Sequence, residues 1–432
     1  MMARIVDLNW RRPGTLKWAL LALAGVALAW RILSLNMADQ HAQELQEPEA
    51  ALTWDADQPG ANLALGLRDL AKDPDAALAR LHSAIAANPT EGRAFAALGL
   101  LMERRGEAAK ARQAMETASR LSPQRGDVQT EVAAYWMRQG DLKHALGHWN
   151  TVLRWRGEEH ARIFPELLKL AGDPARHAAF MSLLEQPVVW WPAFFNYAAA
   201  KAPDVNTVRV LFNLQQGGPN AATPDMLRAY LARLQRENQW LEAWFVWLNS
   251  LPKEQIRRMG YLYNGSFETP LTDLGFDWIH QKHPAVMLDT AGTYDSSGDR
   301  ALRVSFRGLR VQFQHLYQYL MLPPGEFRLH GRVRPDNLQA EQGMQWALYC
   351  VGQNAPLAVT DRFRGSNPWT RFRTPFTIPA EGCPVQMLRL ELAGTVRLDF
   401  DATGTIWFDD LAIEKMRAPG SEASVVQSQH GS

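Results

Sequence analysis

The pattern of apolar and polar positions changes once along the chain, near residue 260. Before this point apolar residues recur at the three- and four-residue spacing of helices, as the tryptophans within 240–247 do. After it apolar and polar residues alternate, as in 301–306 and 387–392, which is the period of half-buried strands. Turn sequences such as that at 323–325 separate the strands. We therefore predict a multidomain α + β protein, with helices first and an antiparallel β-sandwich after them.

Small and apolar residues repeat every 34 residues in the first helical part. The matching sets are Ala77, Ala111 and Ala145; Leu81, Met115 and Trp149; Ala84, Ala118 and Val152; Pro89 and Pro123; and Gly106 and Gly140. Paired helices approach closely only where a small residue faces the partner, and Pro ends a helix. The period and these residues resemble the tetratricopeptide-repeat family. The resemblance implies an α-solenoid over 57–157, with a concave surface for protein partners.

The period decays between 158 and 260, where we expect degenerate helical repeats. Trp240, Trp244 and Trp247 share one helical face there. We expect this stripe to face a core, and an exposed groove for a protein partner is the alternative.

An uncharged run from Trp18 to Trp30 lies near the N-terminus, and apolar residues continue past Arg31. Basic residues precede the run; they are Arg4, Arg11, Arg12 and Lys17. We expect 1–37 to be a cytoplasmic segment and an uncleaved, single-pass inner-membrane anchor, with its N-terminus inside and the bulk of the chain in the periplasm. A cleaved signal peptide and a soluble helix are the alternatives. Residues 38–56 are predicted to be a linker, and 417–432 a disordered tail.

Composition adds two constraints. The net charge of +1 over 432 residues gives no reason to expect a nucleic-acid partner. The two cysteines, Cys350 and Cys383, could form one disulfide in an exported protein, or they could stay unpaired.

Short motifs bracket the strand-rich segment. They are Asn264-Gly265-Ser266-Phe267-Glu268, Trp278, the turn at Gly298 and Trp407-Phe408-Asp409-Asp410-Leu411. Together they resemble the jelly-roll carbohydrate-binding modules of cellulases and xylanases. The resemblance covers 261–416 and implies a sandwich with a glycan ligand. It also implies a structural calcium held by Glu268, Asp409 and Asp410 with backbone carbonyls. In the alternative, Glu268 and Asp410 bond backbone amides.

Strand alternation locates the expected sugar face. If the strands near 316–322, 327–333 and 387–392 are neighbours, their outer residues combine aromatic rings with planar polar groups, as sugar sites do. These residues are Phe313, His315, Tyr317, Tyr319, His330, Arg332, Arg389 and Glu391. A solvated face and a face covered by the helices are the alternatives.

No nucleophile, zinc, P-loop or dinucleotide motif is present, so we expect the protein not to be an enzyme. Paired carboxylates for glycoside hydrolysis depend on their spatial separation, which sequence does not give. The whole architecture resembles accessory proteins of exopolysaccharide assembly. It implies a membrane-anchored periplasmic scaffold that binds a glycan; the alternative is a pure protein-interaction scaffold whose sandwich binds no sugar.

Overall fold

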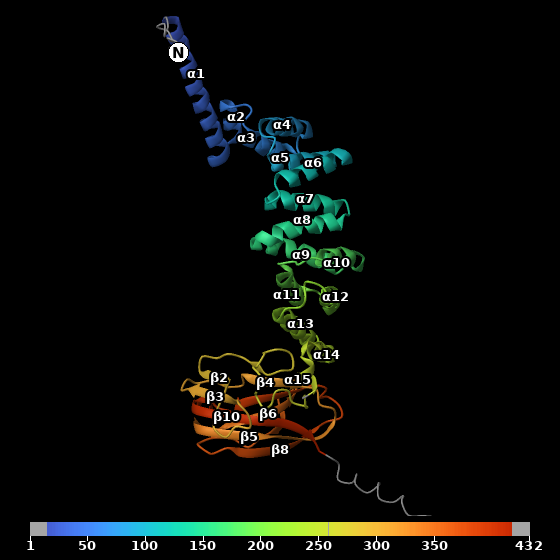
Figure 1. The fold of residues 1–432 in the computed structure, drawn as a ribbon, viewed down its shortest axis with the longest axis vertical. Coiled ribbons are helices and arrows are strands. Elements are labelled where there is room, and N and C mark those ends of the chain that lie inside the picture. Colours follow the sequence, from blue (N-terminus) through green and yellow to red (C-terminus); the bar gives the residue numbers. More distant parts are fainter. Residues whose placement is uncertain (1–14, 258, 417–432) are drawn as a thin grey trace, which may run out of the picture. The chain divides into compact units, whose positions relative to one another are not determined.

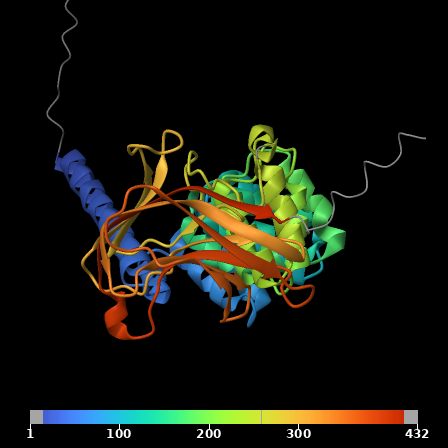
Figure 2. The same cartoon turned by 90° about the horizontal axis from the view of Figure 1, so that it is seen from below.

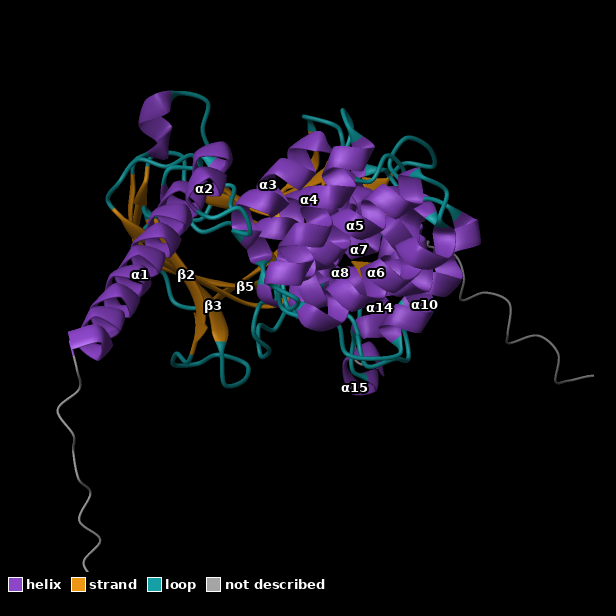
Figure 3. Ribbon diagram, turned by 90° about the horizontal axis from the view of Figure 1, so that it is seen from above, coloured by secondary structure: helices purple, strands orange, loops and turns teal. Residues whose placement is uncertain are grey.

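The computed structural model describes residues 15–257 and 259–416, and in these ranges helices precede strands as predicted (Figures 1 and 3). Arg4, Arg11, Arg12 and the tail 417–432 lie outside the described residues. The chain forms two compact units. One holds the residues up to Phe194 together with Asn213–Ala221, and the other holds Phe195–Phe212 together with the residues from Ala222 onward. The sandwich therefore shares a unit with the last helices, which were predicted as part of a separate helical segment.

The first helix, α1 (Thr15–Asp39), is 25 residues long and exposes its apolar side chains; Val26, for example, is 70% exposed. At 1.5 Å per residue it is roughly 37 Å long, more than the ~30 Å hydrocarbon core of a bilayer. Within the described residues it belongs to the one stretch long and apolar enough to cross a membrane. A signal sequence has the same properties, so the structure supports a membrane span or a signal sequence equally.

The segment predicted as a linker contains regular structure. It holds a π-helical turn (Gln40–Glu44) and the helix α2 (Pro48–Trp54), which packs on α1 and on the next helix. Ala51 of α2 is completely buried, which explains why this Glu-rich stretch is ordered.

Six helices carry the 34-residue period. They are α3 (Pro59–Asp69), α4 (Pro74–Ala87), α5 (Gly92–Arg104), α6 (Ala108–Leu121), α7 (Gly126–Arg138) and α8 (Leu142–Trp155). Consecutive helices pack in pairs, and the bounds of α4, α6 and α8 repeat at the same interval as the sequence. The matching alanines Ala77, Ala111 and Ala145 are fully buried between helices. The period is thus a property of the structure as well as of the sequence, while membership of the tetratricopeptide family stays a prediction.

Shorter helices follow. They are α9 (His160–Ala171), α10 (His177–Leu184), α11 (Trp191–Lys201), α12 (Val205–Leu214), α13 (Pro224–Arg236), α14 (Trp240–Ser250) and α15 (Lys253–Arg257), with 3-10 turns at Gly157–Glu159 and Pro174–Arg176. On α14, Trp247 is fully buried, whereas Trp240 and Trp244 are half-buried. The tryptophan stripe therefore faces a core, as expected.

The sandwich consists of two five-stranded antiparallel sheets. Sheet A has the order β1 (Ile279–His280), β4 (Leu316–Leu320), β9 (Gln386–Leu392), β6 (Met344–Cys350) and β7 (Pro356–Val359). Sheet B has the order β2 (Val286–Ala291), β3 (Ala301–Arg307), β10 (Ala402–Lys415), β5 (Gly325–Ala340) and β8 (Thr370–Ile378), and a 3-10 turn spans Arg397–Phe400. The strands of sheet B follow one another in this order in Figure 1, and Figure 2 shows the sandwich from below.

Strict alternation places one apolar row of each sheet in a shared core. Every second residue of β4 and β9 is buried. Trp346 of sheet A lies at the centre, with ring centroids 5.4 Å from Trp278 and 5.3 Å from Phe408 of sheet B. The two bracketing motifs meet at the edge of this core, because the Leu411 amide donates to the Gly265 carbonyl (2.9 Å). A Cβ at Gly265 would clash with the Leu411 carbonyl, which explains why the motif has glycine there.

Cys350 at the end of β6 and Cys383 before β9 are joined in a disulfide. Both are buried in the described structure. The sequence left their pairing open because the register of β6 and β9, which brings them together, is not local information.

Candidate functional site

The residues predicted to form one sugar face are divided between the two sheets. β4 and β9 are neighbours, with Tyr317 directly opposite Arg389. β5 belongs to sheet B, where it pairs with β10 and β8, so His330 and Arg332 lie on the outer face of the other sheet. The expectation that β5 is a neighbour of β4 is therefore wrong. At the turn after β4 the chain crosses between sheets, and alternation within a strand does not distinguish such a crossing from a hairpin.

Phe313 is also corrected by the structure. It is 1% exposed and packs in the core against Phe306, at 5.7 Å between ring centroids. The alternation of inner and outer residues does not reach back to Phe313, because β4 begins only at Leu316. His315 precedes the strand and is half-buried beside His283, with their rings 5.1 Å apart.

The outer surface of sheet A, which we call the tyrosine face, combines rings and polar groups from three adjacent strands. It consists of Tyr317 and Tyr319 of β4, Arg389 and Glu391 of β9, and Gln345 and Tyr349 of β6. The registers place Gln345 opposite Glu391 and Ala347 opposite Arg389, with Tyr349 two residues beyond Ala347. Tyr349 was not predicted. It is out of phase with the core residues Trp346 and Leu348, so the same alternation could have found it.

A tight polar network orders the centre of the tyrosine face. The guanidinium of Arg389 donates to Glu391 at 2.7 Å and stacks on Tyr349, with Cζ 4.4 Å from the ring centroid. The Tyr349 hydroxyl and the Gln345 amide also donate to the Glu391 carboxylate, at 3.0 and 3.1 Å. Burial and then the nearby Glu391 charge raise the pKa of Tyr349, so its hydroxyl keeps its proton at neutral pH. The network fixes the directions of several planar groups at once.

One end of the tyrosine face is covered. Tyr319 packs against Trp240 of α14 with the rings tilted by 59° and 4.9 Å between centroids, and burial raises the pKa of Tyr319 to about 12. Its neighbour Tyr317 contacts Tyr319 edge to face at 5.4 Å and is half-buried. The expected alternative of a face covered by helices thus applies to Tyr319. Tyr317, Arg389 and Glu391 lie on the remaining part of the face, beside this contact.

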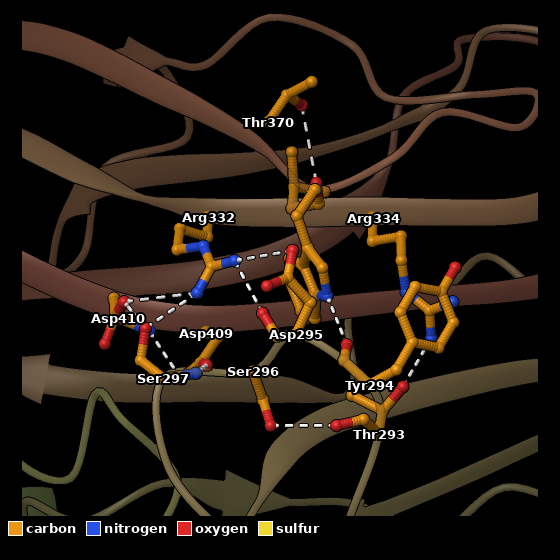
Figure 4. A network of polar contacts seen from close by, with 12 residues as sticks. Thr293, Tyr294, Asp295, Ser296, Ser297, Arg332, Arg334, Thr370, Asp409 and Asp410 are labelled. Atoms are coloured by element: carbon orange, nitrogen blue, oxygen red, sulfur yellow. Dashed lines mark hydrogen bonds and ion pairs between the residues drawn. The ribbon is translucent and has the colours of Figure 1, made fainter.

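The outer surface of sheet B, the arginine face, is built on cation–π contacts (Figure 4). Arg334 is nearly buried, and its Cζ lies 4.3 Å from the ring centroid of Tyr294 and 5.1 Å from that of Trp407. Arg332 lies 5.0 Å from the ring centroid of Trp369. Arg332 also donates to Ser297 Oγ (2.7 Å) and to the Asp295 carbonyl (2.6 Å). These contacts hold the loop between β2 and β3 against the sheet, a role that the sequence did not indicate.

The three carboxylates expected to hold calcium bond to this same loop. Glu268 accepts from the amides of Asp299 (3.3 Å) and Arg300 (3.2 Å), and the fully buried Asp409 accepts from the Ser297 amide (2.8 Å). Asp410 accepts from the Ser297 hydroxyl.

For Glu268 this arrangement fits the alternative in which the carboxylate bonds backbone amides, whereas Asp410 bonds a hydroxyl and it is Asp409 that accepts from an amide. Calcium needs six to eight oxygen ligands, whereas these oxygens face N–H and O–H donors. Within 15–257 and 259–416 no three His, Cys, Asp or Glu side chains gather as a possible metal site. The donor set does not fit a calcium cage as it stands, and calcium binding stays a prediction.

Buried carboxylates make stability depend on pH. Desolvation raises the pKa of Asp277 above its usual 3.8, and it is the largest cause of this shift. The native state then binds more protons than the unfolded state between 3.8 and the raised value, so stability falls as pH rises through this window. We expect Asp277→Asn to remove this slope. In urea titrations followed by hydrogen exchange of peptides from the sandwich, the unfolding free energy of the unit that holds Asp277 should shift in favour of the variant, relative to wild type, as pH rises through the window.

The same titrations at high salt give the control for Asp277. A shift caused by burial should persist there, whereas one caused by neighbouring charges would be screened. A difference that does not change with pH would contradict this assignment.

Comparisons with known proteins give only structural likenesses. No family model matches the chain, and no curated protein matches it. Among solved structures, CBM4 is 14% identical with a TM-score of 0.28, over 36% of this chain and 99% of its own. TmCBM61, solved with beta-1,4-galactotriose, is 21% identical with a TM-score of 0.25, over 37% of this chain and 99% of its own. The CBM22-1 xylan-binding domain of Xyn10C from Paenibacillus barcinonensis is 14% identical with a TM-score of 0.23, over 33% and 86%. These values record a likeness of the sandwich fold to carbohydrate-binding modules.

Proposed function

We propose that this chain is a membrane-anchored glycan-binding accessory protein and that the tyrosine face holds the sugar. The observation that carries the proposal is the contiguous row of Tyr317, Arg389, Glu391 and Tyr349 on three paired strands. Sugar rings stack their C–H faces on aromatic rings, and their hydroxyls pair with planar donors and acceptors. On this face the half-buried ring of Tyr317 stands beside the guanidinium of Arg389, while the Tyr349 ring is 7% exposed and holds Arg389 in place.

The order within the network supports binding over a chance solvated surface. Arg389 is held by Glu391 and by the ring of Tyr349, and its side chain is only 21% exposed. A side chain that is already fixed loses little rotamer entropy when a ligand arrives. The tyrosine face is therefore pre-organised for a ligand with hydroxyl groups.

The remaining parts of the proposal concern the setting. In it, α1 anchors the chain in the inner membrane with its N-terminus inside, and the rest lies in the periplasm. The helical repeats recruit protein partners for exopolysaccharide or surface-glycan assembly, and the protein itself catalyses no reaction. The disulfide favours an oxidising compartment over the cytoplasm.

A pure scaffold is the second candidate, and one observation favours it. Tyr319 is already occupied by Trp240, so a part of the tyrosine face serves packing within the protein. In this case the chain binds no glycan, and replacement of Tyr317 or Arg389 leaves the binding of protein partners unchanged.

Glycan binding can be tested on the full chain in a detergent without a sugar headgroup, which would otherwise compete. Calorimetry with neutral oligosaccharides such as xylohexaose and β-1,4-galactotriose should detect binding to wild type. Loss of one stacked ring or one charged hydrogen bond costs about 1.5–3 kcal/mol, so Tyr317→Ala and Arg389→Ala should each weaken binding by roughly tenfold or more.

Tyr294→Ala is the matched control, because this exposed tyrosine lies on the arginine face. It should leave affinity for neutral glycans unchanged. Equal losses in all three variants, or no binding by wild type to any oligosaccharide tried, would overturn the proposal.

A further inference from the structure

We propose that the outer surface of the β5–β8 pair is a second ligand site, which binds the carboxylate groups of an acidic glycan. The assignment of a glycan rests on the proposed function, whereas the anionic group is inferred from this surface alone. The site lies on sheet B, the opposite sheet to the one that carries the tyrosine face.

Basic side chains stand directly opposite each other across these two strands. His330 is paired with Arg373, and Arg332 with Arg371. Arg332 and Arg371 are both cations at neutral pH, and like charges in directly opposed positions repel and destabilise a sheet. An arrangement that lowers stability in this way calls for a compensating anion.

The nearby carboxylates compensate only the β5 side. His330 lies 3.2 Å from Glu414, and Arg332 lies 3.8 and 4.0 Å from Asp295 and Asp410. Arg371 and Arg373 are exposed, and within the described ranges their side chains have no ion pair or hydrogen bond. Two guanidinium groups are therefore left with unused donors on one face of one strand.

The surface between these residues is hollow. A depression of about 600 Å³ is lined by His330, Arg332, Arg371, Arg373 and Asp410. Arg371 and Arg373 are two residues apart on an extended strand, about 7 Å along it. Their planar forks match carboxylates in bidentate geometry, and the hollow leaves room for a chain that carries them.

Two features favour an acidic sugar over a simple inorganic anion. The site adjoins aromatic side chains: the ring of the half-buried Trp369 lies against Arg332, and its indole N–H donates to the carbonyl of Tyr294, which is 69% exposed. Rings beside guanidinium groups are the combination that a uronic acid uses, with its C–H face and its carboxylate.

Protection of the edge strand β8 against aggregation is the competing explanation for the two arginines. Charges on an edge strand do give such protection. Protection of an edge strand needs charge of either sign, however, and does not require one cation opposite another inside a hollow.

The test compares ligands and variants on the full chain in the same detergent. The probes are an oligogalacturonate, the neutral oligosaccharide that wild type binds, inorganic phosphate and single-stranded DNA. Arg371→Gln with Arg373→Gln should weaken oligogalacturonate binding by roughly tenfold. It should leave neutral binding unchanged and the melting temperature unchanged or higher, because the cross-strand repulsion is relieved. Added salt should weaken oligogalacturonate binding to wild type and have little effect on the neutral ligand.

Arg362→Gln with Arg364→Gln is the matched control, since it removes the same charge at the same spacing elsewhere on the sandwich. It should leave the binding of oligogalacturonate and of the neutral oligosaccharide unchanged. If oligogalacturonate binding survives the Arg371 and Arg373 changes but is lost in Tyr317→Ala, the second site is wrong and the proposed function stands. If phosphate or DNA binds as tightly as oligogalacturonate, the acidic-glycan assignment is wrong. If wild type binds oligogalacturonate but no neutral oligosaccharide, the anionic site is supported and the proposal that the tyrosine face binds a neutral sugar is wrong.

Discussion

Replacing Trp247 by alanine should lower the stability of the unit that contains the sandwich by about 3–5 kcal/mol, the usual cost of removing a fully buried Trp or Phe side chain. Trp247 of α14 is 0% exposed. Its ring lies 5.1 Å from Tyr263 and 5.6 Å from Phe276, both of which belong to the segment leading into the strands. The variant would leave a cavity where α14 meets the segment that leads into the strands, so helix and sandwich should lose stability together.

Gly275 shows how close this contact is. It has a φ of +62°, and a Cβ there would lie 2.5 Å from Trp247 Cδ1. Gly275→Ala should therefore destabilise the same contact from the sandwich side, through backbone strain and overlap with the indole. Agreement between the two variants would identify the interface, rather than α14 alone, as the part affected.

Hydrogen exchange measured by mass spectrometry suits this prediction, because a chain with two compact units does not unfold as one two-state system. Peptides from α13–α14 and from the strands should lose protection to a similar extent, while peptides from α3–α8 keep theirs. Trp155→Ala is the control, as this residue is 77% exposed and its loss should change little. Loss of protection in α14 only would show that the helices and the sandwich are energetically independent.

The elements of this fold could be predicted where the determining pattern is local. The 34-residue period depends on which residues face each other within one helical pair, and the helices α4, α6 and α8 follow it closely. The alternation in β4 and β9 likewise matches the buried and exposed residues. The assignment of β5 to the sheet of β4 failed, because the sheet that a strand joins depends on pairings with β8 and β10 that lie far away in the sequence.

The predictions for the candidate site succeeded and failed for the same reason. Tyr317, Arg389 and Glu391 were placed together correctly, since their strands do pair. His330 and Arg332 were correctly placed on an outer face, but on the wrong sheet. The arginine face could not be foreseen, because Arg371 becomes informative only when the register puts it opposite Arg332. Whether either face binds a glycan stays a prediction.

Replacing Cys350 and Cys383 by serine should cost the sandwich about 3–4 kcal/mol, the loop-closure entropy that a link across some 33 residues removes from the unfolded chain. The two cysteines are separated by 33 residues in the sequence. The closed loop contains β7 and β8, both edge strands. We expect these strands to lose hydrogen-exchange protection first, and with them the pairing that places Arg371 opposite Arg332.

Reductant provides the internal control for this disulfide. It should lower the melting temperature of wild type to that of the double serine variant and have no further effect on the variant. A wild-type protein that is unaffected by reductant while its thiols titrate as free would contradict the prediction. The result also bears on the compartment, because a domain that loses this much stability on reduction is suited to an oxidising environment and poorly suited to the cytoplasm. A large loss would thus support the periplasmic location independently of α1.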